Sequence, residues 1–211
     1  MELSLVGWLA GLACGLLATA ALSLGMNRVG AARLGPADRV TLTRTVLIGG
    51  VAALVADALV RPPALAILVP MATVALVLDG VDGFVTRRTG TASVLGARFD
   101  MEADSVLILI LSLHVARHAG AWALLLGAAR YLFVAAGWLL PWMRARLPFR
   151  YWRKVVAATV SIALIVAMAD VLPPPAAQAG LLLAVVLLAE SFGRDVWWLH
   201  RRRRRLGSAA G

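Results

Sequence analysis

Charged residues and cysteines are scarce in this chain. Charged side chains make up 15% of its 211 residues and hydrophobic ones 61%. A soluble domain carries about a quarter charged residues, so this composition excludes an ordinary soluble globular domain. It also excludes intrinsic disorder, which requires low hydrophobicity. Cys14 is the single cysteine, and an internal disulfide framework is therefore excluded.

The apolar residues form blocks of about 20, the length at which a helix crosses a bilayer. These blocks predict an all-α protein, a polytopic bundle of transmembrane helices. Proline-rich links at 61–63 and 173–175 predict tight reversals between spans, because proline stops a helix. The first block lacks the positively charged start of a signal peptide, so we interpret it as a retained helix. The seven predicted spans are 3–24, 42–60, 62–80, 99–117, 119–141, 155–172 and 177–199.

Acidic residues are also few, 11 against 21 Lys and Arg, which gives a net charge of +10. On a soluble protein this excess would indicate nucleic acid. In a chain of apolar blocks it indicates topology and contact with anionic lipid headgroups, so we expect membrane lipids and no nucleic acid as partners. Of the 21 basic residues, 18 fall on one side of the predicted spans. The positive-inside rule predicts a multi-pass protein of the cytoplasmic membrane with its N-terminus outside.

Five of the acidic residues fall within the 26 residues from 79 to 104. Asp79 and Asp82 are three residues apart and Asp100 and Asp104 are four apart, so each pair shares a helix face. Only 12 uncharged residues separate Asp104 from the next charge, which is too few for a span. The helix must therefore begin before Asp100, which puts both aspartates of the second pair below the inner surface.

Carboxylates at that depth are costly unless they face a polar cavity with partners. Two interpretations stay open. A divalent cation would resolve the repulsion, since hard carboxylate oxygens suit Mg²⁺ or Mn²⁺. Alternatively, Arg87, Arg88 and Arg98 form salt bridges with the cluster. Gly83 and Gly96 beside the cluster indicate close approach of a ligand or of another helix.

The segment from Asp79 to Asp104 resembles the signature of the CDP-alcohol phosphatidyltransferase family, D-x2-D-G-x2-A-R-x8-G-x3-D-x3-D. Every spacing fits, and only the alanine differs, replaced by Thr86. The segment 36–44 is similar to the N-x-L-T-x-x-R opening of the family's first core helix, with Asp38 in place of asparagine. More faintly, 153–160 resembles a segment of phosphatidylglycerophosphate and cardiolipin synthases.

The resemblance implies a six-helix family core over 36–200, preceded by an extra helix and link at 1–35 and followed by a basic tail at 201–211. It implies transfer of a phosphatidyl group from CDP-diacylglycerol to a small alcohol, with release of CMP, in phospholipid biosynthesis. It also implies two Mg²⁺ or Mn²⁺ ions, an active site on the cytoplasmic side and a homodimer. Within the family, the sequence most resembles the phosphatidylglycerophosphate and phosphatidylinositol phosphate synthases.

The resemblance also assigns roles to single residues. Asp104 is implied as the general base that takes the proton of the acceptor hydroxyl. The implied metal ligands are Asp79, Asp82, Asp100 and Asp104, and the implied nucleotide-binding residues are Asp82, Gly83, Arg87 and Gly96.

Basic residues further along the chain are candidates for the acceptor. Arg130 falls halfway along the fifth predicted span, where an arginine should face a cavity or pair with an acid such as Glu190. With Arg153 and Lys154 it predicts a pocket for a phosphorylated polyol, such as glycerol 3-phosphate or inositol phosphate. Another acceptor, phosphatidylglycerol or serine, stays open. Glu190 and Arg194 are four residues apart and are expected to pair.

Two other classes of protein are considered. A small cation or solute transporter could use the acidic cluster as its path, but the cluster lies on one side only and the halves do not repeat, as they do in many transporters. A catalytically dead relative with a structural role is disfavoured, because all four aspartates are present.

Overall fold

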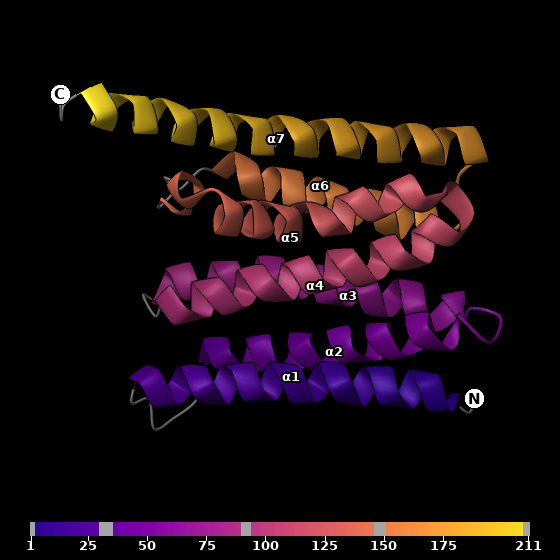
Figure 1. Cartoon of the computed structure of the whole chain (residues 1–211). Helices are drawn as coiled ribbons and strands as arrows, with labels where there is room; N and C mark the ends of the chain where they lie inside the picture. The colour runs from indigo at the N-terminus through magenta and orange to yellow at the C-terminus, as the bar shows by residue number, and fades with distance from the viewer. Residues whose placement is uncertain (1–2, 30–35, 90–93, 146–150, 209–211) are drawn as a thin grey trace. The chain divides into compact units, whose positions relative to one another are not determined.

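The computed structural model describes residues 3–29, 36–89, 94–145 and 151–208, with side chains described over 3–20, 42–81, 100–145 and 151–203. This part of the chain contains helices and no strand (Figure 1), so the predicted all-α fold is confirmed. The α-helices are α1 (Leu5–Val29), α2 (Pro36–Asp57), α3 (Leu65–Thr89), α4 (Val94–Ala119), α5 (Leu124–Leu139), α6 (Tyr151–Met168) and α7 (Pro174–Ser208), with 3₁₀ turns η1 (Ala121–Ala123) and η2 (Pro141–Arg144).

Each α-helix overlaps one of the predicted spans. Three helical stretches are long and apolar enough to cross a membrane, and α1 and α3 carry shorter apolar stretches, so this is a membrane protein. Crossing by the remaining helices stays a prediction. The three stretches are Ala121–Leu139, Tyr151–Met168 and Pro174–Arg203, and the shorter ones are Leu5–Ala20 and Leu65–Val81.

The first predicted proline link lies between helices, and the second overlaps the first turn of α7. α2 ends at Asp57 and α3 begins at Leu65, on either side of the prolines at 62–63. α7 begins at Pro174, where the missing proline N–H costs nothing because the first turn of a helix has no intrahelical acceptor for it.

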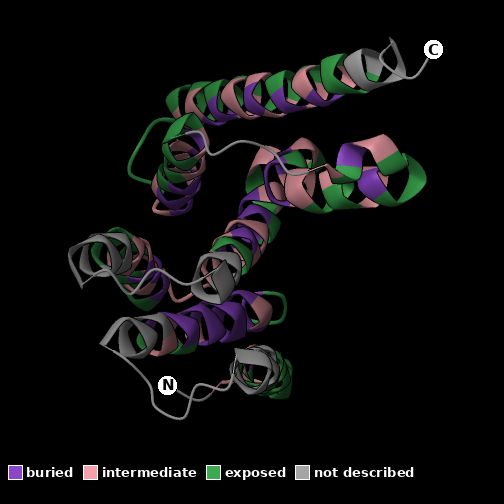
Figure 2. Ribbon diagram, turned by 90° about the vertical axis from the view of Figure 1, so that its left-hand side faces the viewer, coloured by how far each residue is buried: buried purple, intermediate pink, exposed green. Residues whose placement is uncertain are grey.

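The chain forms two compact units, residues 1–114 and 115–211. In the first unit α2 packs against both α1 and α3. Residues 51–55 of α2 are all buried (purple in Figure 2), as expected for a helix that is apolar around its whole circumference. α2 is therefore the core helix of this unit.

The α1–α2 contact depends on small residues. A side chain at Gly7 or Gly11 of α1 would meet Ala53 of α2 at 3.0 Å, whereas nothing lies within 4 Å of a side chain at Gly15. Small residues four apart let two membrane helices approach closely. At the end of the contact, the Ser4 backbone N–H donates to Asp57 Oδ1 at 2.7 Å.

In the second unit α7 packs against α6 and α5. The rings of Phe133 on α5 and Phe192 on α7 have centroids 5.3 Å apart. Leu181, Ala184 and Leu199 of α7 are fully buried, at helical spacing. α7 is thus held along its length by one buried stripe.

Candidate metal centre

Three aspartates from two helices converge in the first unit. Asp79 lies on α3, and Asp100 and Asp104 lie one turn apart on the same face of α4. One carboxylate oxygen of each lies within 4.8 Å of the others. The three side chains are 24–29% exposed, so they are accessible to an ion or a phosphate. The sequence prediction that these carboxylates meet is confirmed.

Arg44 of α2 lies among these carboxylates. Its side chain is 1% exposed, and its Nη1 lies 3.0 Å from Asp79 Oδ1. Nη1 also contacts Asp100, and Nη2 contacts Asp104. One guanidinium therefore joins three carboxylates on two other helices.

This role of Arg44 was not predicted from the sequence, although Arg44 is the final residue of the segment similar to N-x-L-T-x-x-R. The predicted salt-bridge partners were Arg87, Arg88 and Arg98, and their side chains lie outside the described residues. The available signal was that Arg44 is the single charge in the 17 residues between Arg39 and Asp57. An arginine in such an apolar helix needs a partner.

The described charges of this site do not balance. Three carboxylates and one guanidinium carry a net charge of −2 when ionised. Hard oxygen ligands with this net charge fit a divalent cation such as Mg²⁺ or Mn²⁺. Partial exposure matters too, because Mg²⁺ is usually bound through one or two carboxylates together with substrate phosphates. The residues present therefore fit a divalent metal.

Other charged residues are paired in the second unit. Arg153 of α6 meets Asp195 of α7 through both Nε and Nη2, each 2.8 Å from a carboxylate oxygen. Glu190 pairs with Arg194 as predicted, and it also accepts a hydrogen bond of 2.9 Å from Trp152 Nε1. The α6–α7 contact thus carries a polar network.

The ion pair of Asp195 was likewise not predicted from the sequence. It is 4% exposed and lies four residues from buried Ser191 and four from buried Leu199. An acidic residue on the buried stripe of a helix predicts an internal partner, and this position was the signal.

Family membership follows from a comparison of the sequence. A family model described as CDP-alcohol phosphatidyltransferase matches residues 35–190, which include Arg44 and the whole aspartate cluster. The chain belongs to this family. CDP-alcohol phosphatidyltransferases are membrane transferases of phospholipid biosynthesis that move a phosphatidyl group from a CDP-linked alcohol to another alcohol. Neither the curated proteins nor the solved structures contain a significant match.

Four further positions of the phosphatidyltransferase signature cannot be placed in the same detail. The backbones of Asp82, Gly83 and Arg87 belong to α3 and that of Gly96 to α4. Their surroundings lie outside the described residues. Asp82 as a metal ligand, and all four as nucleotide-binding residues, stay predictions.

The candidate acceptor residues of this transferase all lie in the second unit. Arg130 on α5 and Arg153 on α6 are half-buried, and Lys154 is exposed. Arg130 makes an electrostatic or hydrogen-bonding interaction, and Arg153 is held by Asp195. Their role toward an acceptor stays a prediction.

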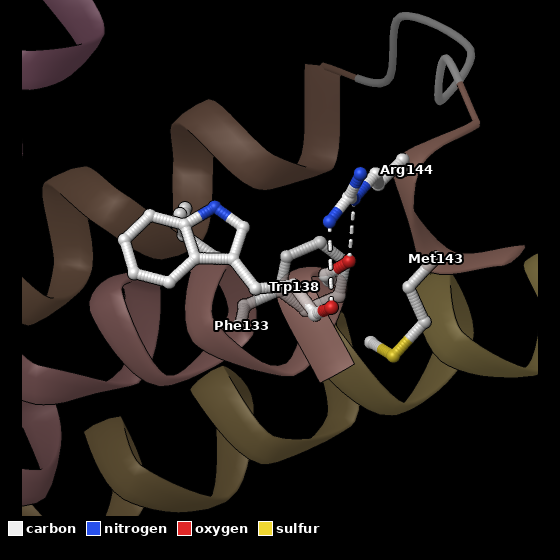
Figure 3. Close-up of a pocket in the computed structure, with 6 residues that line it drawn as sticks. Phe133, Trp138, Met143 and Arg144 are labelled. Atoms are coloured by element: carbon white, nitrogen blue, oxygen red, sulfur yellow. Dashed lines mark hydrogen bonds between the residues drawn. The ribbon is translucent and has the colours of Figure 1, made fainter. Parts of the chain in front are cut away.

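The second unit also contains an open groove of about 500 Å³ between the end of α5 and η2 (Figure 3). Arg144 points its guanidinium at the end of α5, where Nε donates to Gly137 O at 2.8 Å and Nη2 to Trp138 O at 3.3 Å. Arginine commonly caps the last carbonyls of a helix in this way. The groove is lined by Phe133, Val134, Gly137, Trp138, Met143 and Arg144.

Proposed function

We propose that this protein transfers a phosphatidyl group from CDP-diacylglycerol to a phosphorylated polyol, such as glycerol 3-phosphate or inositol phosphate, at the cytoplasmic face of the membrane. The observation that carries the proposal is the convergence of Asp79, Asp100 and Asp104 within the family match. The family identity supplies the reaction, and this cluster supplies a place for its metal.

Asp79, Asp82, Asp100 and Asp104 would hold the metal. Bound Mg²⁺ or Mn²⁺ supplies neutralisation of the pyrophosphate charge, as in other phosphoryl transfers. Two ions are expected because the family resemblance implies two, and Asp82 would add a fourth carboxylate to the three that converge. Partial exposure of the three described aspartates supports this role, since it leaves room for the phosphates.

Asp104 acts as the general base. Its carboxylate takes the proton of the acceptor hydroxyl as the hydroxyl oxygen forms a bond to the β-phosphorus of CDP-diacylglycerol. The bond from that phosphorus to the CMP oxygen breaks, and CMP leaves with the electron pair. The helix face that Asp104 shares with Asp100 supports the assignment, because it places the base beside the metal ligands.

The nucleotide is held by the loop-side ends of α3 and α4. Gly83 and Gly96 allow close approach of the cytidine nucleotide, and Arg87 meets its phosphates. Their positions at matching places in the family signature support these roles.

Arg130, Arg153 and Lys154 bind the phosphate of the acceptor. Arginine presents a planar fork to phosphate, whereas lysine presents a point charge. Asp195 holds Arg153 through two of its three guanidinium nitrogens, which fixes the orientation of the third. An amine-bearing acceptor such as serine would be repelled by such a pocket.

The test is CMP release from CDP-diacylglycerol by the purified protein in detergent, with Mg²⁺ or Mn²⁺ and a panel of acceptors. We expect release with glycerol 3-phosphate or inositol phosphate and none after chelation by EDTA. Efficient transfer to serine or phosphatidylglycerol, with none to a phosphorylated polyol, would overturn the acceptor assignment but not the family activity. Crosslinking in the membrane tests the homodimer that the family resemblance implies.

Replacing Arg130 by alanine tests the acceptor site directly. We expect the KM for the phosphorylated acceptor to rise about tenfold or more, since one charge-assisted contact to phosphate is lost. The KM for CDP-diacylglycerol should stay unchanged. The control is Arg194→Ala, which removes an exposed arginine paired with Glu190. Equal increases in both KM values would show that the role of Arg130 is not specific to the acceptor.

A further inference from the structure

We propose that Arg44 is a built-in counter-cation of the metal centre and that its charge sets how tightly the aspartates bind a divalent ion. The inference rests on the proposed metal site and names a residue outside the aspartate signature. Its basis is one guanidinium on α2 that contacts Asp79, Asp100 and Asp104.

Burial shows that Arg44 is a fixed part of the site. Its side chain is 1% exposed, whereas the three aspartates are 24–29% exposed. The guanidinium of Arg44 is therefore the buried part of the cluster, and the carboxylates are the part that solvent reaches.

The contacts explain how three like charges stay together. The carboxylate oxygens lie within 4.8 Å of one another, a separation at which ionised carboxylates repel strongly in a partly buried site. The positive charge of Arg44 offsets this repulsion, because its guanidinium contacts all three carboxylates. The cluster is then assembled before an ion arrives, which spares the ion the cost of gathering its ligands from two helices.

The same charge opposes the ion. Arg44 contacts the carboxylates that a divalent cation would contact, and two cations that share ligands at this distance repel each other. The guanidinium lowers the net charge that the described groups offer the ion from −3 to −2. We expect the loss of this opposing charge in a variant to outweigh the loss of assembly, because Asp100 and Asp104 stay one turn apart on α4 whatever their partner. Arg44 thus keeps the metal weakly bound and exchangeable.

The experiment compares Mn²⁺ binding to wild-type protein and to Arg44→Gln, by electron paramagnetic resonance of free Mn²⁺ in detergent solution. We expect Arg44→Gln to bind Mn²⁺ about tenfold or more tightly, a change of about 1.4 kcal/mol. In EDTA the same variant should unfold at a lower temperature than wild type, and saturating Mn²⁺ should raise that temperature by more than it does in wild type.

A second variant, Arg44→Lys, separates the effect of the charge at position 44 from that of the shape of the side chain. It also keeps the proposal testable if Arg44→Gln does not fold. Lysine keeps the charge and loses the fork, so the Mn²⁺ affinity should stay within about threefold of wild type. Two controls lie away from the cluster. Arg194→Gln removes an arginine from a pair with Glu190, and Asp57→Asn weakens the α1–α2 contact. Neither should change the affinity.

The outcomes separate the two proposals. Unchanged or weaker Mn²⁺ binding by Arg44→Gln, or a tenfold change in Arg44→Lys, would overturn the counter-cation role alone. Wild-type protein that binds no Mn²⁺ would overturn both this inference and the proposed metal site. Wild-type protein that binds Mn²⁺ but releases no CMP from CDP-diacylglycerol with any acceptor would overturn the proposed function alone.

Discussion

Asp104 and Glu102 lie two residues apart on α4 and differ in burial and in their neighbours. Asp104 is half-buried and faces Arg44 and the other aspartates, whereas Glu102 is exposed. Residues two apart on a helix do not share a face, so the helix itself separates them. A comparison of the two positions therefore isolates the effect of the cluster from that of removing an acid.

We expect Asp104→Asn to reduce CMP release by about 10²–10⁴-fold, the usual contribution of a positioned general base. Asparagine keeps the size of aspartate and one oxygen for Arg44, so the protein should fold and still bind CDP-diacylglycerol. Release is measured by a coupled CMP assay and lipid binding by calorimetry. Glu102→Gln is the control and should leave turnover near that of wild type. Wild-type turnover in Asp104→Asn would refute the base assignment.

The sequence predicts the meeting of the aspartates but not their partner. The i, i+4 spacing of Asp100 and Asp104 places them on one face of one helix whatever the tertiary structure. Arg44 lies 56 residues before Asp100, and its contact depends on how α2 packs against the helices that follow. Asp57 and Asp195 are similar cases, since each is buried against a partner that lies far from it along the chain. Spacing along the chain cannot supply a contact of this kind.

At the scale of helices, hydropathy predicts the apolar middle of each helix better than its ends. α3 continues to Thr89 and α4 begins at Val94, so both extend beyond the predicted spans 62–80 and 99–117. α7 likewise continues to Ser208 through the arginine run. The helices continue past their apolar segments into charged residues, because Arg is a good helix former. The aspartate signature consequently lies on helices over most of its length.

The contact between α1 and α2 gives a test at this scale. We expect Gly11→Leu to destabilise the protein by about 1–3 kcal/mol, since the new side chain would overlap Ala53 of α2. Gly15→Leu is the matched control, because it adds the same side chain to the same helix where no atom lies within 4 Å. The measurement is thermal unfolding in detergent. Equal destabilisation by both variants would show that α1 does not pack through its glycines.

At the scale of the whole molecule, the distribution of basic residues predicts the orientation in the membrane. α7 alone has 35 residues, a length of about 52 Å at 1.5 Å per residue. This exceeds a hydrocarbon core of about 30 Å, so one end of α7 must project beyond it. Arg201 stacks on Trp197 with its guanidinium carbon 3.7 Å from the ring centroid, which suits a helix end at the headgroup level.

We expect the N-terminus outside the cytoplasm and the C-terminus inside. Cys14 is the single cysteine, so Cys14→Ala gives a background without thiols in which a cysteine can be appended ahead of Met1 or after Gly211. An impermeant maleimide should label the first of these proteins in intact cells and the second only after permeabilisation. Protection of the N-terminal cysteine in intact cells would reverse the predicted orientation or show that α1 does not cross.

The hydrogen bond from Ser4 to Asp57 has a consequence for how the protein is made. The start of α1 finds a polar partner only at the end of α2, and the Asp57 carboxylate is buried at that same contact. During synthesis α1 leaves the ribosome first, so the Ser4 backbone N–H and the Asp57 carboxylate cannot meet until the second helix has been made. We therefore expect α1 and α2 to pair as a hairpin, and a protein shortened to the family match at residue 35 to be less stable because Asp57 would have lost its hydrogen bond from Ser4.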